Sequence, residues 1–194
     1  MSSGICAVIL AAGVGQRYQD AAGAGQDKLL ALCTGLDGVP RAVLEHSLIH
    51  LSGITDRRVL VTQPARRGVI ELARQYDCEV VLLESAGMGD SLAGGVKAAA
   101  TASGWLVVLA DMPFIHAASL AAVAASVRPG SISVPDAGQG HGHPVGFARE
   151  FGDALMALRG DQGARRLFAD AHVYKVAVAD PGIYRDVDTP ADLV

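Results

Sequence analysis

The sequence predicts an α/β fold, a single domain built on a doubly wound and mostly parallel sheet, and three observations predict it. Apolar runs of four to seven residues recur along the chain, and such runs are typical of strands buried on both faces of a parallel sheet. Segments with a helical pattern fall between them, so strand and helix alternate. The length of 194 residues is close to that of one domain, so we expect one domain over residues 1–194.

Six segments are predicted to form strands: residues 5–10, 57–62, 79–83, 105–110, 131–134 and 172–178. The last of them alternates polar and apolar residues, which favours a place at the edge of the sheet. The first helical pattern has Pro40 in its first turn, where a residue without an N–H is suited. The helical patterns cover residues 40–50, 65–76, 90–102, 117–127, 149–158 and 161–169.

Composition excludes several classes of protein. Apolar residues make up 51% of the chain, which is enough for a full core, so we do not expect disorder. The formal net charge of −4 leaves no basic excess for binding nucleic acid. No apolar run reaches the roughly 18 residues of a membrane span, and the first residues lack the basic start of a signal peptide. Three widely spaced cysteines are typical of reduced thiols, so we expect a cytoplasmic protein.

Ligands of open α/β sheets bind outside the carboxyl ends of the strands. In this chain the segments that follow three of the predicted strands are residues 11–28, 84–91 and 111–113. Glycine is in excess, with 23 in 194 residues, and it clusters in the first two of these segments. We therefore expect the three segments to line one crevice, where the backbone approaches a ligand closely.

The segment after the first strand runs LAAGVGQR from Leu10 to Arg17, and Lys28 follows it. Small residues allow backbone amides to cradle phosphate oxygens, and the two cations suit a polyphosphate. The dinucleotide-binding pattern GxGxxG does not fit, because Tyr18 stands at its third glycine. The Walker A pattern does not fit either, because Leu29 follows the lysine. A flexible loop with two solvated charges is the alternative.

Several further motifs follow in a fixed order. A KLL sequence comes after the first loop, GMGxSLxxGV begins at Gly87, and DMP begins at Asp111. GHP begins at Gly142, GDxGAR at Gly160 and DxDTP at Asp186. In this order the motifs resemble nucleotidyltransferases of molybdenum-cofactor biosynthesis over almost the whole chain. The second and fourth motifs resemble the branch of molybdenum cofactor cytidylyltransferases more than the molybdopterin-guanine-dinucleotide synthases.

The resemblance implies a Rossmann-like nucleotidyltransferase fold and an activity. The activity is transfer of a nucleotidyl group from CTP, or from GTP, to the terminal phosphate of molybdopterin, with release of pyrophosphate. Mg²⁺ is the implied cofactor, and a molybdoenzyme of the xanthine dehydrogenase type is an implied partner. Residues 18–27 form a longer stretch between the arginine and the lysine than the family pattern has.

The site residues follow from the resemblance. Those expected to act in catalysis are Arg17, Lys28 and Asp111. Those expected to bind the nucleotide are Leu10, Ala11, Ala12, Gly13, Gly15, Arg17, Lys28, Gly87, Met88 and Ser91. Those expected to bind the acceptor are His143 and Pro144, and the expected metal ligands are Asp111 and Asp188.

Some of these residues also have ordinary structural interpretations. Asp188 stands before Thr-Pro and equally fits the N-cap of a last helix, while Asp186 is a weaker candidate for the metal. Ser91 either contacts the base or ribose or caps a helix, with Asp90 as its competitor. Asp161 is expected to cap the helix that follows it.

Two other functions remain open from the sequence. A nucleotidyltransferase could act on another phosphate acceptor, such as a sugar phosphate or methylerythritol phosphate. A non-catalytic carrier that delivers the cofactor would also bind nucleotide, and the long stretch over residues 18–27 is the feature that favours it.

Overall fold

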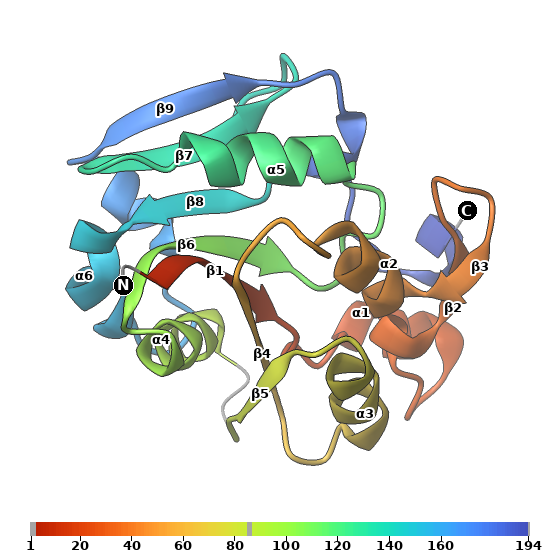
Figure 1. Ribbon diagram of the computed structural model, residues 1–194. Helices are drawn as coiled ribbons and strands as arrows, with labels where there is room; N and C mark the ends of the chain where they lie inside the picture. Colours follow the sequence, from red (N-terminus) through yellow and green to blue (C-terminus); the bar gives the residue numbers. More distant parts are fainter. Residues whose placement is uncertain (1–2, 85–86, 194) are drawn as a thin grey trace.

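The computed structural model describes residues 3–84 and 87–193, and their centre is a mostly parallel sheet (Figure 1). Within these residues seven strands form one sheet in the order β5-β4-β1-β6-β8-β7-β9. The strands are β1 (Ser3–Leu10), β4 (Arg57–Thr62), β5 (Glu79–Leu82), β6 (Ala102–Leu109), β7 (Ser131–Asp136), β8 (Val145–Ala148) and β9 (His172–Ala177). The predicted α/β class with a mostly parallel, doubly wound sheet is confirmed.

One strand breaks the parallel pattern. β8 runs antiparallel to both β6 and β7, whereas the other pairs in the sheet are parallel. The sequence did not predict β8, because its four residues follow glycines and Pro144 and give too short a signal. β9 lies at the edge of the sheet, as its alternating pattern predicted.

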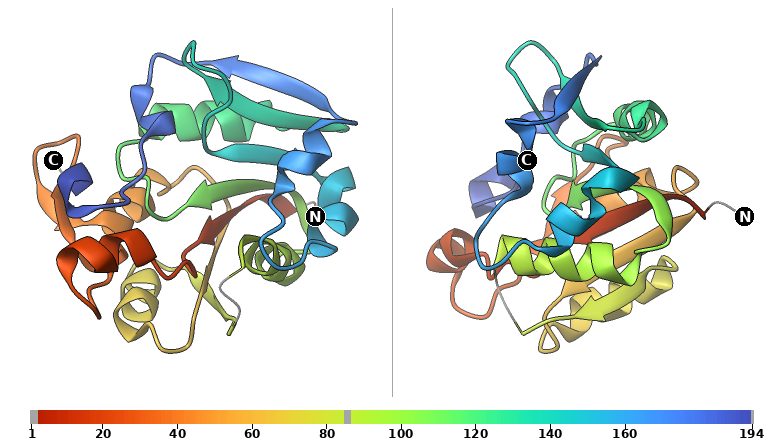
Figure 2. Two further views of the ribbon diagram at one scale, coloured as in Figure 1. Left: turned by 180° about the vertical axis from the view of Figure 1, so that it is seen from behind. Right: turned by 90° about the vertical axis from the view of Figure 1, so that its left-hand side faces the viewer.

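Helices cover both faces of the sheet. Successive side chains of β1 point to opposite faces, and because both sets are apolar, each face needs helices to bury it. Ala7 and Ile9 pack in one core with residues of α2 (Val43–His50), α3 (Arg67–Gln75) and α5 (Ala117–Ser126). Cys6 and Val8 pack in the other core with α4 (Met88–Ala98) and with Leu155 of the short α6 (Gly152–Met156). Figure 2 (left) shows α4 and α6 in front of the sheet and α5 behind it.

The predicted helix over residues 40–50 begins later than expected. Pro40–Ala42 form β3, which pairs antiparallel with β2 (Leu32–Thr34), and α2 begins at Val43. Gly38 has a φ of 76° and allows the tight turn between the two strands. Pro40 is tolerated in β3 because, within the described residues, this sheet consists of β2 and β3, and a strand edge without a neighbour requires no N–H donor.

Other helices also differ from their predicted bounds. α4 covers Met88–Ala98 rather than residues 90–102, because the chain turns at Ala99 and enters β6 at Ala102. The prediction over residues 149–158 corresponds to a 3-10 turn, Arg149–Phe151, followed by α6. The prediction over residues 161–169 corresponds to the 3-10 helix Ala164–Phe168, whose N-cap is Gly163, so Asp161 does not cap it.

The long stretch between the two predicted cations contains an element that the sequence analysis treated as loop. Residues Gln16–Ala22 form α1, and Tyr18 anchors this helix in the core. A 3-10 helix, Lys28–Leu30, follows with Asp27 as its N-cap. None of the helices in the described residues is both long enough and apolar enough to cross a membrane.

Candidate active site

The carboxyl ends of β1 and β6 form the base of the site. These neighbouring parallel strands end opposite each other, with Leu10 beside Leu109, and the amide of Ala110 donates to the Leu10 carbonyl over 3.1 Å. The glycine-rich loop and Asp111 therefore leave the sheet side by side. A cavity of about 290 Å³ opens there, which we call the donor cavity. Its lining residues are Leu10, Ala11, Ala12, Gly13, Gly15, Arg17, Lys28, Leu29, Met88, Ser91, Leu109, Asp111, Asp186 and Asp188.

The structure brings together nearly all the residues that were predicted to bind the nucleotide. Gly87 is the exception, because it is not among the residues described as lining the donor cavity. It is the N-cap of α4, and a Cβ there would lie 2.5 Å from the Gly160 carbonyl oxygen. Its small size therefore serves close packing against another segment. Ser85 and Ala86, within the predicted segment 84–91, lie outside the described residues.

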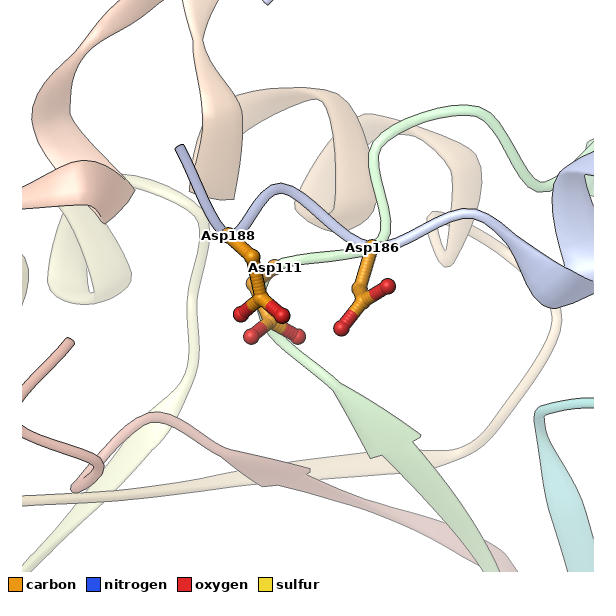
Figure 3. Close-up of side chains that lie close together, drawn as sticks. All are labelled: Asp111, Asp186 and Asp188. Carbon is orange, nitrogen blue, oxygen red and sulfur yellow. The ribbon is translucent and has the colours of Figure 1, made fainter. Parts of the chain in front are cut away.

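Three carboxylates converge in the donor cavity (Figure 3). Asp111, Asp186 and Asp188 each offer an oxygen within 4.8 Å of the others, and we call them the acidic cluster. The Val187 amide donates to the Asp111 carbonyl over 2.8 Å, and the Val187 side chain is fully buried. Asp186 and Asp188 flank Val187 in the sequence, and Figure 3 shows their carboxylates close to that of Asp111.

Lys28 lies among these carboxylates. Its Nζ donates to Asp111 Oδ2 over 2.5 Å and to the Val187 carbonyl over 2.9 Å, and it lies 3.5 Å from Asp188 Oδ1. The side chain is only 10% exposed, so the alternative of a solvated charge is wrong for Lys28. Arg17, from α1, pairs its Nη1 with Asp188 Oδ2 over 2.6 Å while remaining 77% exposed.

The carboxylates of the acidic cluster repel one another, so nearby positive charge stabilises them. Burial raises the pKa of Asp186 above its usual range, and the neighbouring carboxylates of Asp188 and Asp111 add to the shift, while Lys28 opposes it. Oxygen ligands on three carboxylates are the set that Mg²⁺ or Mn²⁺ prefers, so these residues could hold a divalent cation. The N-cap interpretation of Asp188 does not hold, because its carboxylate pairs with the two cations and Asp192 accepts the Thr189 amide.

The glycine-rich loop faces the same cavity. A Cβ built on Gly13 would meet no heavy atom within 4 Å, so the loop leaves open space there. Gly15 has a φ of 63° and is the N-cap of α1, a conformation that favours glycine. Ser91 is not a helix cap, because α4 begins at Met88, and its Oγ donates to the Gly87 carbonyl over 2.9 Å.

A second cavity of about 220 Å³ adjoins the donor cavity, and we call it the aromatic cavity. The two share Leu10, Met88 and Leu109 in their linings. The other residues that line the aromatic cavity are Leu92, Val107, His141, Gly142, His143, Val145, Phe147, Gly163, Ala164, Arg165 and Phe168. Its walls are thus mainly apolar and aromatic, with two histidines and an arginine as polar groups.

His143 is a half-buried polar residue of the aromatic cavity, and its Nδ1 atom is fully buried. Its amide donates to the Ile183 carbonyl over 3.0 Å, but its buried Nδ1 has no hydrogen-bond partner among the described residues. Burial lowers the pKa of this imidazole below its usual range, although Asp111 opposes the shift. Pro144, predicted with it as an acceptor-binding residue, is buried and is not among the described lining residues.

Sequence reasoning missed two residues that hold the loops of the site. The Tyr184 hydroxyl accepts from the Ala137 amide over 2.9 Å and donates to the Gly140 carbonyl over 2.8 Å, which holds the loop that leads to His143. Arg66 contacts the glycine-rich loop from behind. Neither stands in a motif, and only the tertiary structure reveals their contacts.

Comparison with known proteins identifies the family and the fold of this chain. Residues 7–176 match the family model described as the MobA-like NTP transferase domain. A nucleotidyl transferase from Methanothermobacter thermautotrophicus has a TM-score of 0.82 at 22% identity, covering 97% of this chain and 93% of that chain. That identity shows a shared fold alone. No curated protein gives a significant match.

Two mycobacterial structures are more similar in sequence. The homologue of Rv0371c from Mycobacterium sp. strain JC1 is 29% identical, with a TM-score of 0.79 over 97% of this chain and 92% of that chain. Rv0371c from Mycobacterium tuberculosis, solved in complex with manganese, is 27% identical, with a TM-score of 0.73 over 97% of this chain and 95% of that chain.

Proposed function

We propose that this chain, which belongs to the MobA-like NTP transferase family, transfers a cytidylyl group from CTP to the terminal phosphate of molybdopterin. The observation that carries the proposal is the pair of adjoining cavities. One is polar, with the acidic cluster and two cations, and the other is apolar and aromatic. A triphosphate in the first and a ring system in the second would meet at their shared wall.

The chemistry requires positioning more than proton transfer. An oxygen of the acceptor phosphate forms a bond to the α-phosphorus of the nucleotide, the bond to the bridging oxygen breaks, and pyrophosphate leaves. The attacking phosphate is already an anion, so no general base is needed. The obstacles are repulsion between anions and charge on the leaving group. Lys28 and Arg17 would bind the triphosphate oxygens, and amides of the glycine-rich loop would donate to them.

The acidic cluster supports a divalent cation, which we propose is Mg²⁺. Asp111, Asp188 and Asp186 would hold it, and it would neutralise charge on the triphosphate. The ammonium of Lys28 lies close to two of these carboxylates, Asp111 and Asp188. A positive charge is therefore stabilised at this position, which supports the binding of a cation there. The mycobacterial Rv0371c structure, 27% identical, was solved in complex with manganese, which supports the proposal that a protein of this fold binds a divalent ion.

The aromatic cavity favours a planar heterocycle over a sugar as the acceptor. Sugar hydroxyls need many hydrogen-bond partners, and burying them among Phe147, Phe168 and apolar side chains would be costly. A pterin ring can stack on such side chains, and its polar edge can pair with the unpartnered Nδ1 of His143. The choice of CTP over GTP is supported by the resemblance of GMGxSL, from Gly87, and of GHP to the cytidylyl branch. We further propose that the product passes to a cytoplasmic molybdoenzyme.

Release of pyrophosphate by the purified protein tests the proposal. Molybdenum-loaded molybdopterin and Mg²⁺ would be supplied with CTP, GTP or ATP in parallel. Release with CTP alone is the expected result. Release with GTP would retain the donor cavity and overturn the base assignment. No release with any of them, by a folded protein, would favour another acceptor or the non-catalytic carrier.

A paired variant tests the acceptor separately. His143→Ala is expected to raise the KM for molybdopterin about tenfold or more, while nucleotide binding stays unchanged, because it removes a polar group of the aromatic cavity alone. The matched control is His172→Ala, which alters an exposed histidine on β9. Equal acceptor KM values for the two variants would argue against a pterin in the aromatic cavity.

A further inference from the structure

Arg66 links two parts of the donor cavity that are separate in the sequence. It is the residue before α3, and its side chain is 13% exposed. It is not among the residues described as lining the donor cavity. We propose that Arg66 is a positioning residue that fixes the glycine-rich loop and Lys28 relative to each other for binding the triphosphate. This inference rests on the proposed function.

The first contact is with the backbone of the glycine-rich loop. Arg66 Nη1 donates to the Ala11 carbonyl over 2.5 Å and to the Gly13 carbonyl over 3.1 Å. In a trans peptide the N–H of the next residue points away from the carbonyl. Holding these two carbonyls on the Arg66 side therefore turns the amides of the next residues away from Arg66. The first of these amides belongs to Ala12, which lines the donor cavity, and we infer that it faces a phosphate oxygen.

The second contact is with the residue before the lysine. Arg66 Nε donates to Asp27 Oδ2 over 2.8 Å, and Arg66 Nη2 pairs with Asp27 Oδ1. The same Oδ1 accepts from the Leu29 amide over 3.0 Å, as the N-cap of the 3-10 helix that begins at Lys28. The guanidinium thus fixes the start of the turn from which the lysine reaches the acidic cluster.

The planar guanidinium is the group that this geometry requires. Its donors reach two carbonyls and both oxygens of one carboxylate at once, and a lysine ammonium lacks that fork. The contact also explains how the structure tolerates the long stretch over residues 18–27. Arg66 holds Asp27, the residue before Lys28, so the position of the lysine depends on that contact more than on the length of the intervening chain.

The experiment compares Arg66→Lys and Arg66→Met with Arg67→Met, a matched control at the exposed neighbouring arginine. Equilibrium binding of CTP with Mg²⁺, the KM for CTP, kcat and the melting temperature are measured for each. Both Arg66 variants are expected to bind CTP about 10- to 100-fold more weakly, because small misplacements of binding groups carry penalties of this size. Arg67→Met should bind like the wild type.

The lysine variant separates geometry from charge. If Arg66 acted only through its positive charge, Arg66→Lys would bind CTP like the wild type, and that result would overturn the proposal. A purely structural role would lower the melting temperature and leave the CTP affinity of the folded protein unchanged, which would also overturn it. If Arg66→Met does not fold, Arg66→Lys and Asp27→Asn carry the test, with weakened CTP binding expected for both.

The same measurements keep the two proposals apart. Wild-type protein that binds no nucleoside triphosphate would overturn the proposed function and this inference with it. Wild-type and Arg66 variants that bind CTP equally well would overturn the inference alone. A raised KM for CTP together with an unchanged KM for the acceptor would support a role confined to the donor cavity.

Discussion

The ammonium of Lys28 lies 2.5 Å from the carboxylate of Asp111, although 83 residues separate them in the sequence. Asp111 lies two residues after the central strand β6, which ends at Leu109, whereas Lys28 begins a 3-10 helix after the glycine-rich loop. The same ammonium reaches toward Asp188, so a cation of the chain itself offsets the repulsion within the acidic cluster. In our proposal this ammonium is shared between the carboxylates and the triphosphate when substrate binds.

Replacing Asp111 by asparagine should nearly abolish turnover while preserving the fold. The change keeps the shape of the side chain but removes the negative charge next to Lys28, and with it a ligand for the divalent cation. We expect pyrophosphate release to fall at least about 100-fold, which corresponds to about 2.7 kcal/mol of lost transition-state stabilisation.

The matched control for this loss is Asp153→Asn, at an exposed aspartate of α6. It should release pyrophosphate at the wild-type rate. If Asp111→Asn did the same, the acidic cluster would have no part in the reaction.

Replacing Lys28 by methionine should make the protein depend on divalent cations for its stability. Without the ammonium the acidic cluster loses the more buried of the two cations that pair with it, and we expect the free energy of unfolding to fall by about 1–3 kcal/mol. Each kcal/mol lowers the melting temperature of a chain of this size by about 2–4 °C. Added Mn²⁺ or Mg²⁺ should raise the melting temperature of the variant more than that of the wild type.

Thermal melts with and without the cation measure this effect, and Lys97→Met, at an exposed lysine of α4, is the control. Cation-induced shifts of equal size in wild type and Lys28→Met would contradict a metal site built from these carboxylates.

Replacing Gly13 by alanine should separate folding from binding. No heavy atom lies within 4 Å of the new Cβ, and Gly13 does not have a positive φ, so the fold should keep or gain up to about 1 kcal/mol. Gly13 lines the donor cavity, so we expect the added methyl group to hinder close approach of the triphosphate and CTP affinity to fall about tenfold or more. Gly15→Ala is the contrast, because its φ of 63° makes that change cost about 1–2 kcal/mol.

Urea unfolding and CTP titration, made on the same preparations, give the two quantities. A Gly13→Ala protein that binds CTP as tightly as the wild type would show that the triphosphate does not approach this part of the loop.

The loop before His143 should loosen in acid because of Asp136. The amide of Gly138, the ammonium of Lys175 and the amide of Gly140 hold the pKa of this carboxyl below its usual value of about 4. A group with a depressed folded-state pKa stabilises the fold above its unfolded-state pKa. That stabilisation is lost as the pH falls through the folded-state value.

The difference in unfolding free energy between wild type and Asp136→Asn should therefore be constant above about pH 5 and shrink below about pH 4. Urea titrations over this range measure it. A difference that persisted undiminished to about pH 2 would contradict the contribution of the ionised carboxylate.

The parts of the fold that sequence predicted are those with a strong local signal. The apolar runs that became β1, β4 and β6 were predicted to within a few residues, because a strand buried on both faces must be apolar at nearly every position. β8 and the β2-β3 pair were missed, because segments of three or four residues with glycine or proline nearby carry little periodicity. Their pairing depends on partners distant in the chain.

The site divides in the same way. The sequence motifs contain Asp111, Lys28 and the glycine-rich loop. From these residue types alone, we predicted a site suited to an anionic nucleotide. The tertiary structure decided that Asp186 joins the acidic cluster. That outcome depends on the amide of Val187 pairing with the carbonyl of Asp111, which no local pattern records.

The sequence by itself determined two things about this protein. Its pattern of apolar residues determined that strands alternate with helices, and its residue types determined which carboxylates, cations and glycines are present. Only the tertiary structure decided which of them meet, including the link between Arg66 and Asp27 across 39 residues. The physical reason is that periodicity reports which face of an element is buried, whereas contacts between distant segments depend on how those faces pack.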